Sequence, residues 1–567
     1  MTIMFPCGRR LLIAFVAGLV WMSAAFSQTV KGESDAADAR NGMVVSVSAP
    51  ASRAGVEILQ KGGNAVDAAV ATAFALAVTH PSAGNLGGGG FMVVHPGDGK
   101  EPTVFEYRET APMAATRTMF KKGESMLGHK AAGVPGTVRG LALAHQKFGK
   151  LPWSAVVEPA IKLADQGFVI DESLANSLSW IVCASKDFPE LRRVYGKENG
   201  SDDWDCGDTL VQKDLAATLR LIAQKGADAF YEGAIADKIE AEMKSGGGLI
   251  TKADLASYRA RERKPIHGTY RGYDVYGPPP PSSGGICLIE MLNILENFDL
   301  RKQGRWSPQT LHLMIEAMRR AYFDRARYLG DADFVKIPSQ LTTKDYAREL
   351  AHGIDLHHAI RSEDLAKDIA ITTEGDSTTH FSVIDKDGMG VANTYTLEQS
   401  YGSRVVVKGA GFLLNNEMGD FNLQPGVTTR KGAIGTEANV IAPKKRMLSS
   451  QTPTIVARDG KVVLVTGSPG SRTIINTVLC VLINVLDFDM DVRSAVDAPR
   501  LHHSWFPDLA RFEGAKDHED AVKQLRQMGH SVQGTRQGDA HTIWVDPKTG
   551  TYHGAEDRRI SGKIASY

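Results

Sequence analysis

Apolar and polar positions alternate most clearly in two neighbouring runs, 376–384 and 390–396. Both runs are rich in β-branched and aromatic residues, and a polar turn ending in Asp387-Gly388 separates them. This pattern predicts a β-hairpin. Because side chains alternate with a period of two along a strand, pairing about this turn brings Thr396 to within about one residue of lying opposite Thr378.

The N-terminal part of the mature chain predicts a strand at 43–48 followed by two helices. The first helix should cover 51–61 and end at a pair of glycines. Asn64 can cap the second helix, with Asp67 placed so that its side chain can reach back. The body of that helix, 65–78, is apolar nearly all round, which predicts burial between layers.

A run of glycines at 84–90 is a possible phosphate loop. It lacks the Lys-Ser/Thr ending, and it precedes a predicted strand at 91–95 instead of opening a helix. We therefore exclude nucleotide binding and expect close backbone approach at these glycines. From about 150 to 370 the pattern is mostly that of amphipathic helices. Further predicted elements are strands at 104–109, 453–456, 462–466 and 541–545 and helices at 286–295 and 472–486.

Composition and charge narrow the class of protein. The 567 residues are enough for one large layered domain or several conventional ones. Lysine plus arginine equals aspartate plus glutamate, with 65 of each, so the balance gives no reason to expect nucleic acid or an acidic membrane surface as a partner.

The first residues have the features of an export signal. Arg9 and Arg10 precede an apolar run at 11–22, and small residues at 23–27 could form a cleavage site. The run is short for a bilayer span, although a retained membrane anchor is the alternative. We expect a signal peptide at 1–27, a periplasmic or secreted mature protein, and no membrane association after the leader is removed.

Cysteine and histidine patterns do not indicate a metal site. Cys287 and Cys480 lie in apolar helical patterns and should be buried thiols. Cys183 and Cys206 flank a polar, acidic loop, and in an oxidising compartment we expect them to form a disulfide. The chain contains no C-x-x-C or H-E-x-x-H motif, so we expect neither a metal nor another cofactor.

Several motifs occur in an order that resembles the small subunit of γ-glutamyltransferases, which are N-terminal-nucleophile (Ntn) hydrolases. The resemblance extends over nearly all of the chain after the leader. It implies an α+β protein with a four-layer αββα sandwich, built from two subunits cut from one precursor: a large subunit, 28–377, and a small subunit, 378–567. The motifs are D-S-T-T-H-F-S-V at 376–383, T-Y-T-L at 394–397, L-L-N-N-E-M-G-D-F at 413–421 and L-S-S-Q-T-P-T-I at 448–455.

The resemblance also implies which residues carry the chemistry. The bond between Ser377 and Thr378 is the expected processing site, and Thr378 is the nucleophile, with Thr396 hydrogen-bonded to it. The strand-loop-helix junction that contains Gly470 and Ser471 offers backbone N–H groups to an oxyanion. The family often has Gly-Gly here, so Ser471 is a less permissive second position.

The remaining site residues are expected to hold a γ-glutamyl donor. Arg108 is at a strand end, where an arginine is usually a solvated charge, but its planar fork suits an α-carboxylate. In the resembling family a serine pair is a second carboxylate anchor, two loop carboxylates hold the α-amino group, and an Asn or Glu also contacts it. A loop at 425–437 corresponds to a lid and lacks an aromatic gate residue. The matching residues here are Ser449, Ser450, Glu417, Asp420 and Glu398.

The activity that the resemblance implies is transfer of a γ-glutamyl group from glutathione or related compounds. The acceptor is water, an amino acid or a dipeptide. Two alternatives remain at this point. One is a glutaryl or cephalosporin acylase of the same superfamily, whose substrates lack the α-amine that Glu417 and Asp420 would bind. The other is a non-catalytic exported binding protein.

Overall fold

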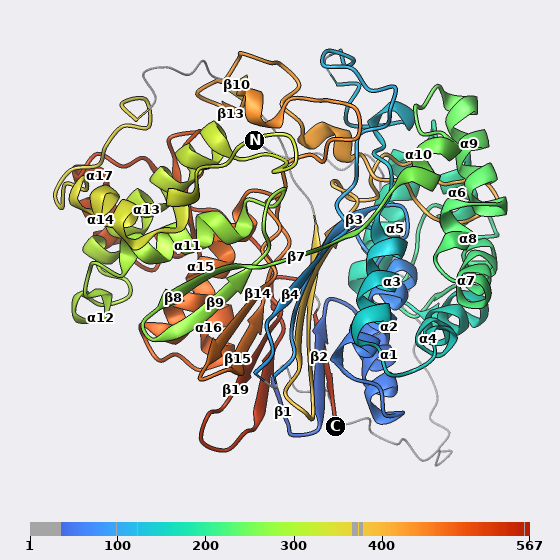
Figure 1. Cartoon of the computed structure of the whole chain (residues 1–567), viewed down its shortest axis with the longest axis horizontal. Helices are drawn as coiled ribbons and strands as arrows, with labels where there is room; N and C mark the ends of the chain where they lie inside the picture. The colour runs from blue at the N-terminus through green and yellow to red at the C-terminus, as the bar shows by residue number, and fades with distance from the viewer. Residues whose placement is uncertain (1–35, 98, 122, 366–371, 374–377, 561) are drawn as a thin grey trace, which may run out of the picture. The chain divides into compact units, whose positions relative to one another are not determined.

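The predicted hairpin forms the middle of a seven-stranded antiparallel sheet (Figure 1). The computed structural model describes residues 36–97, 99–121, 123–365, 372–373, 378–560 and 562–567. In it β11 (Thr379–Asp385) pairs with β12 (Gly390–Thr396). The order of strands is β21 (Lys563–Ser566), β2 (Gly42–Ser46), β11, β12, β3 (Gly89–His95), β4 (Thr103–Glu106) and β7 (Arg261–Arg263).

A second seven-stranded antiparallel sheet packs against the first. Apolar side chains from the two sheets, among them Phe91, Ile384, Ile455, Val465 and Ile543, form one buried cluster between them. The order of strands is β1 (Ala36–Ala39), β20 (Tyr552–Ala555), β19 (Thr542–Val545), β15 (Lys461–Thr466), β14 (Thr454–Arg458), β9 (Tyr273–Gly277) and β8 (Ile266–Tyr270).

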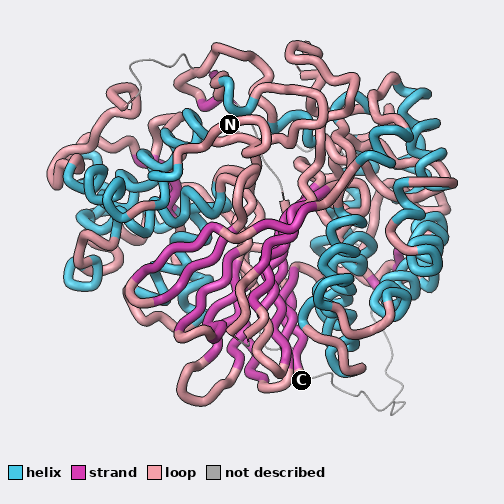
Figure 2. The backbone as a smooth tube through the Cα atoms, viewed as in Figure 1, coloured by secondary structure: helices cyan, strands magenta, loops and turns pink. Residues whose placement is uncertain are grey.

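Helices cover the outer faces of both sheets, so the predicted four-layer αββα sandwich is confirmed (Figures 1 and 2). Each sheet is apolar on both faces, and a buried sheet face requires another layer against it. On the first sheet lie α1 (Ala49–Gln60), α2 (Ala65–Thr79) and α3 (Thr137–Phe148), with α4 (Trp153–Gln166) and α7 (Lys213–Lys225) behind them. The second sheet is covered by α11 (Gly284–Leu295), α15 (Thr473–Leu486) and α16 (Val492–Asp497), and α13 (Pro308–Tyr328) packs against α11.

The caps and burial of α2 are as predicted. The Asn64 side chain accepts hydrogen bonds from the N–H groups of Val66 and Asp67, and the Asp67 carboxylate accepts one from the Asn64 N–H at 3.0 Å. Every residue of α2 is buried. This helix lies between the sheet and α4, which explains why it has no polar face.

The glycine run brings backbones together, as expected. A Cβ atom on Gly88 would lie 2.0 Å from the carbonyl oxygen of Thr396, and one on Gly87 would lie 2.1 Å from that of Leu413. Such distances exclude any side chain. The run therefore lets the end of β12 approach the loop at 413–416.

The region from 150 to 370 is less uniformly helical than predicted. It contains β7, which is an edge strand of the first sheet, and β8 and β9, which are the last two strands of the second sheet. Its further elements are β5 (Phe168–Val169), α5 (Glu172–Ala184), α6 (Pro189–Tyr195), β6 (Thr209–Leu210), α8 (Asp228–Tyr231), α9 (Ala234–Gly246), α10 (Lys252–Ser257), α12 (Leu300–Gln303) and α14 (Lys344–His352). Smaller elements elsewhere are β10 (Thr372–Thr373), β13 (Gly432–Ala433), β16 (Leu501–His502), β17 (Ala510–Phe512), α17 (Glu519–Gln527) and β18 (Val532–Gln533).

The expected disulfide between Cys183 and Cys206 is wrong: both residues are thiols in the structure. Cys183 lies near the C-terminal end of α5. The N–H of Gly207 donates to the carbonyl oxygen of Ile170 at 3.0 Å, so Cys206 lies near the other end of that helix. A helix of this length separates its ends by roughly 20 Å, and a disulfide needs Cα atoms within about 7 Å.

Two predictions lie outside the described residues: the leader at 1–27 and Ser377, the residue before the expected cut. None of the helices in the described part of the chain combines the length and the apolar character that a bilayer span requires.

Candidate active site

Thr378 and Thr396 lie at the same end of the hairpin. The β11–β12 register pairs Thr379 with Tyr395, so one further step places Thr378 opposite Thr396. Both threonines line one pocket. The pocket is also lined by most of the other predicted site residues, namely Arg108, Glu398, Glu417, Asp420, Ser449, Ser450 and Ser471.

The end of β12 is held firmly. The Asn85 side chain donates to the Thr396 carbonyl oxygen at 2.9 Å, and Gly88 approaches the same oxygen closely. The Thr396 hydroxyl accepts a hydrogen bond from the Glu398 N–H at 2.8 Å. These contacts fix the Thr396 side chain beside the pocket.

Arg108 follows β4 and is fully buried. Its two terminal nitrogens pair with Glu417 and with Asp420, and a further carboxylate, Glu109, lies 3.6 Å away. The Arg108 Nε donates to the carbonyl oxygen of Met447 at 3.3 Å. The sequence analysis assigned Arg108 to the donor carboxylate and the two loop carboxylates to the donor amino group. In the structure these three side chains form one ion cluster.

Three carboxyl groups surround this single guanidinium, so ionisation of all three would leave an excess of negative charge. Burial raises the pKa of Glu109 to about 7, because the attraction of Arg108 only partly offsets the loss of hydration. Burial likewise raises the pKa of Glu417 well above its usual range. A second cation near Glu417 and Asp420 would favour ionisation of these carboxyl groups.

Loops that carry the carboxylates are positioned by asparagines. Asn415 accepts from the Glu417 N–H at 3.0 Å and donates to the carbonyl oxygens of Gly87 and Gly133. Asn416 donates to the Glu398 carboxylate at 2.7 Å. Glu398 has φ of +78°, in the left-handed region that a side chain rarely adopts, and its side chain borders the pocket.

The segment that contains Ser449 and Ser450 pairs with the backbone at Ser282 and Ser283. Ser449 forms a parallel bridge with Ser282, and its carbonyl oxygen accepts from the N–H of Ser283 at 2.8 Å. Ser449 and Ser450 are both buried and both line the pocket. Both serines therefore line the same pocket as Thr378 and Arg108.

The 467–471 loop joins β15 to α15 beside the pocket. Gly470 has φ of +123° and Ser471 has φ of +49°. Ser471 lines the pocket, whereas Gly470 is not among the lining residues. The loop is supported from behind, because the Asp539 N–H donates to Ser468 Oγ at 3.0 Å and the His541 N–H donates to the Gly467 carbonyl oxygen at 3.3 Å.

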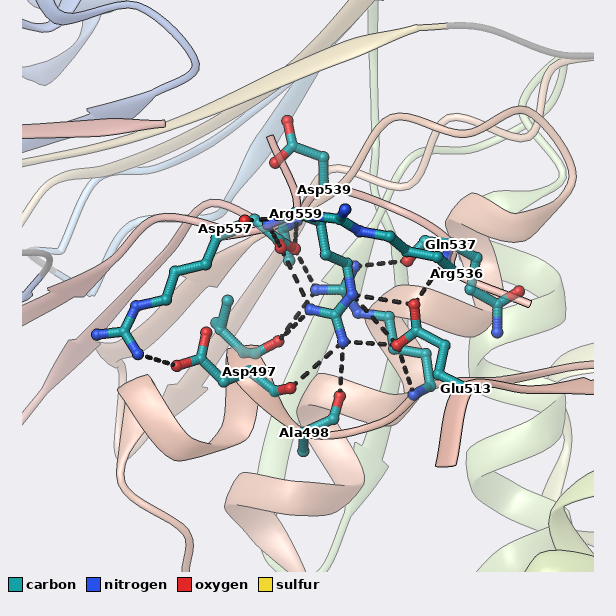
Figure 3. Close-up of polar contacts among 12 residues, drawn as sticks. Asp497, Ala498, Glu513, Arg536, Gln537, Asp539, Asp557 and Arg559 are labelled. Carbon is teal, nitrogen blue, oxygen red and sulfur yellow. Dashed lines mark hydrogen bonds and ion pairs between the residues drawn. The ribbon is translucent and has the colours of Figure 1, made fainter. Parts of the chain in front are cut away.

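A polar network anchors the segment that supports this loop (Figure 3). Arg559 donates to Glu513 at 2.5 Å and to the carbonyl oxygens of Asp497 and Ala498, and it pairs with Asp557 at 3.2 Å. The network therefore links the C-terminal segment to the region that follows α15.

Asp557 is the residue of this network whose loss should cost most. It is fully buried, pairs with the buried Arg500 and accepts from the Ala540 N–H at 2.7 Å. Asp557→Ala leaves Arg500 as an uncompensated charge, so we expect the free energy of unfolding in urea to fall by roughly 3–5 kcal/mol. The control Asp345→Ala, in an exposed pair with Arg348, should cost less than about 1 kcal/mol. Equal losses in the two variants would contradict the expectation.

The same pair has a defined pH dependence. Burial disfavours the charge on Asp557, but Arg500 and Arg559 outweigh it and lower the pKa of the carboxyl group. Because the folded-state pKa lies below the unfolded value of about 3.9, the stabilisation is complete above that pH and is lost as the pH falls further.

Several pocket residues were missed by sequence reasoning. Arg325 and Arg472 line the pocket, as do Asn439 and two residues of the predicted lid, Ile434 and Thr436. Arg325 lies in a regular amphipathic helix with several other basic residues, so the sequence offers no local signal for it. The lid residues could have been found, because the loop at 425–437 was already expected to border this site.

One group of described side chains has metal-ligating atoms close together, namely His312, Glu316 and His530. The two imidazoles are hydrogen-bonded to each other at 2.8 Å, and Glu316 already pairs with Arg319 and Arg320. Two adjacent guanidinium groups oppose the binding of a further cation. The group is therefore a packed polar cluster.

Comparisons with known proteins agree with this geometry. The family described as gamma-glutamyltranspeptidase matches residues 51–567. The chain is 47% identical over 541 residues to the glutathione hydrolase proenzyme of Escherichia coli (strain K12), which covers 93% of this chain and 92% of that protein.

Solved structures show the same relationship. Cephalosporin acylase from Bacillus halodurans superposes with a TM-score of 0.83 at 28% identity, over 96% of this chain and 99% of that chain. Helicobacter pylori gamma-glutamyltranspeptidase superposes with a TM-score of 0.53 at 45% identity, over 54% of this chain and 90% of that chain. The fold, the pocket and these matches together place the chain in the γ-glutamyltranspeptidase family of Ntn-hydrolase enzymes.

Proposed function

We propose that the chain is an exported γ-glutamyl hydrolase and transpeptidase that cuts itself before Thr378. Removal of the leader 1–27 and cleavage of the Ser377–Thr378 bond would give a large subunit, 28–377, and a small subunit, 378–567. The observation that carries the proposal is that Thr378 lines the same pocket as Arg108, Glu417 and Asp420. The Helicobacter chain, which matches about half of this one over 90% of its own length, supports processing into two pieces.

In the processing step the Thr378 hydroxyl would attack the carbonyl carbon of Ser377. The resulting N-to-O acyl shift gives an ester, and hydrolysis of that ester by water frees the α-amine of Thr378. An α-amine has a pKa of roughly 8, so near neutral pH it can accept the proton of the Thr378 hydroxyl. Cutting the chain thereby creates the general base as well as the exposed nucleophile.

The donor's α-carbon carries both a carboxylate and an ammonium, and the pocket has complementary groups for each. Its carboxylate would bind Arg108, Ser449 and Ser450, and its ammonium would bind Glu417 and Asp420, with Glu398 nearby. The ammonium supplies the additional positive charge that the carboxylate cluster lacks. The ion pairs between Arg108 and these carboxylates would then be exchanged for pairs with the donor.

With the donor held at its α-carbon, its γ-carbonyl would lie over Thr378. Attack by the hydroxyl gives a tetrahedral oxyanion, which the N–H groups of Gly470 and Ser471 would stabilise. Collapse releases the amine and leaves a γ-glutamyl ester on Thr378. Water or the amine of an amino acid or dipeptide then takes the γ-glutamyl group. We propose glutathione as a donor, because the Escherichia coli relative is a glutathione hydrolase proenzyme.

Two substitutions at Ser471 test its part in this step. Ser471→Gly keeps the N–H and removes the strain of a side chain at φ of +49°, so turnover should stay within about threefold of wild type. Ser471→Val places a β-branched residue at a φ that it does not tolerate, which should displace the N–H and lower kcat by on the order of 10²-fold. Initial rates with a γ-glutamyl anilide measure both. A valine variant with unchanged kcat would remove Ser471 from the oxyanion site.

The first alternative function is that of an acylase for glutaryl-type amides. It is considered because the fold is similar to that of the cephalosporin acylase from Bacillus halodurans. Its substrates lack the α-amine, so they would leave the carboxylates around Arg108 without a second cation. The presence of Glu417 and Asp420 beside Arg108 therefore favours a γ-glutamyl donor. The second alternative, a non-catalytic binding protein, predicts neither cleavage nor turnover.

One set of measurements separates these functions. Denaturing electrophoresis of the purified protein should give two bands, and the smaller should begin at Thr378. A γ-glutamyl anilide should then be hydrolysed much faster than its glutaryl analogue, and addition of a dipeptide should raise the rate of anilide release. Preference for the glutaryl substrate would support the acylase, and a single inert band would support the binding protein.

A further inference from the structure

Arg325 is a second buried guanidinium in the donor pocket, and the function proposed above gives it no role. It lies on α13 and lines the pocket together with Ser450. Its Nε donates to Ser283 Oγ at 2.9 Å, and its Nη2 donates to Ser450 Oγ at 2.9 Å.

Its charge is balanced differently from that of its neighbours. Arg319 and Arg320, on the same helix, both form ion pairs with Glu316. Within the part of the chain that the structure describes, no carboxylate forms an ion pair with Arg325, and its side-chain hydrogen bonds go to serine hydroxyls. A buried charge without a counter-ion is costly, and an arginine does not give up its proton under ordinary conditions. An anion that enters the pocket would supply the missing counter-charge.

The hydrogen bonds have a fixed direction. A guanidinium can only donate, so both serine hydroxyls must accept from Arg325 and direct their own hydrogens elsewhere. Ser283 does so: its hydroxyl donates to the Ser449 carbonyl oxygen at 2.7 Å. The Ser450 hydroxyl is polarised by the same guanidinium, and Ser450 is one of the residues that line the pocket.

We propose that Arg325 is a positioning residue for the donor, and that it makes Ser450 a charge-assisted hydrogen-bond donor to the substrate α-carboxylate. Arg108 would bind that carboxylate directly, while Arg325 would act on it through Ser450. The ligand class is an acyl donor with a carboxylate on the carbon γ to the scissile carbonyl carbon. This inference rests on the proposed function, because it assumes that this pocket binds a γ-glutamyl group.

Three anilides separate a role in carboxylate binding from a general structural role. The γ-glutamyl anilide has both α-groups, the glutaryl anilide has only the carboxylate, and the 4-aminobutanoyl anilide has only the ammonium. Arg325→Gln should lower kcat/KM by roughly 10- to 100-fold for the two carboxylate-bearing donors, mainly through KM, and by less than about threefold for the third. Arg327→Gln, at an exposed position on the same helix, is the matched control and should change none of them. Equal losses on all three donors would overturn the proposal.

A double-mutant cycle tests the route through Ser450. If Arg325 acts through this hydroxyl, Arg325→Gln should cost far less in a Ser450→Ala background than in wild type. Additive losses would overturn the route. Arg325→Lys keeps the charge but not the fork, so it should recover only part of the affinity.

Failure of the inference is distinguishable from failure of the proposed function. If wild-type protein is not cut or does not turn over the γ-glutamyl anilide, the proposed function fails. If wild type is active but neither the Gln nor the Lys variant at Arg325 is cut into subunits, Arg325 is needed for folding or processing, and a role confined to donor positioning is refuted.

Discussion

Thr378→Ala should give one uncut chain with no measurable hydrolysis of a γ-glutamyl anilide. The methyl side chain cannot attack the Ser377 carbonyl, so neither the break nor the new α-amine forms. Loss of a covalent nucleophile lowers turnover by on the order of 10⁶-fold. Electrophoresis and anilide release measure the two effects independently.

Thr378→Ser is the matched control. Serine retains a hydroxyl group at the same place in the register, so it should still cut the chain and turn over the donor, although more slowly. Two bands from the alanine variant would place the nucleophile at another residue. An uncut serine variant would show that the reaction depends on the threonine methyl group as well.

Arg108→Gln should raise KM for a γ-glutamyl donor by roughly 10²- to 10³-fold. It removes the direct partner of the donor carboxylate and leaves buried Glu109 and Glu417 without their cation. The pKa of each buried carboxyl group then rises further, so folding of the variant should weaken as the pH rises above about 4.3, the unfolded-state value. Steady-state kinetics and urea unfolding at several pH values measure both effects.

Two control variants show whether the change in KM is specific to the guanidinium of Arg108. Arg108→Lys preserves the charge but not the bidentate fork, and it should recover only part of the affinity. Arg193→Gln removes an exposed guanidinium that pairs with Glu190 and Asp214, and it should leave KM unchanged. An unchanged KM in Arg108→Gln would exclude Arg108 from donor binding.

Local features of the fold were readable from the sequence because their causes are local. The hairpin follows from a turn between two β-rich runs, and α2 follows from its Asn64 cap and apolar body. The close approach at Gly88 also follows from composition. In contrast, β7–β9 were missed within a mainly helical region. β7 pairs only with the distant β4, whereas β8 and β9 form a tight hairpin about Arg271-Gly272, a local signal that could have been read.

The candidate site also has features that the sequence predicted and features that it did not. Thr378, Arg108 and Glu417 could be placed because short motifs carry them, and the structure brings them to one pocket. Their mutual ion pairs could not be foreseen, because β4 and the loop at 413–421 meet only through the sheet. Arg325 reaches the pocket from a helix on the other side of the sandwich. The Cys183–Cys206 prediction failed because it considered only the loop between the two cysteines. It did not take into account α5, whose length separates them.

Each sheet combines strands from both sides of Thr378. In one sheet β2 lies between β21 and β11, and in the other β20 lies next to β1. Scission before Thr378 would therefore leave two polypeptides woven through common ladders, with no separable interface between them. They could not part without dismantling both sheets, so each piece made alone should be unable to fold, and the uncut chain must act as the template for its own assembly.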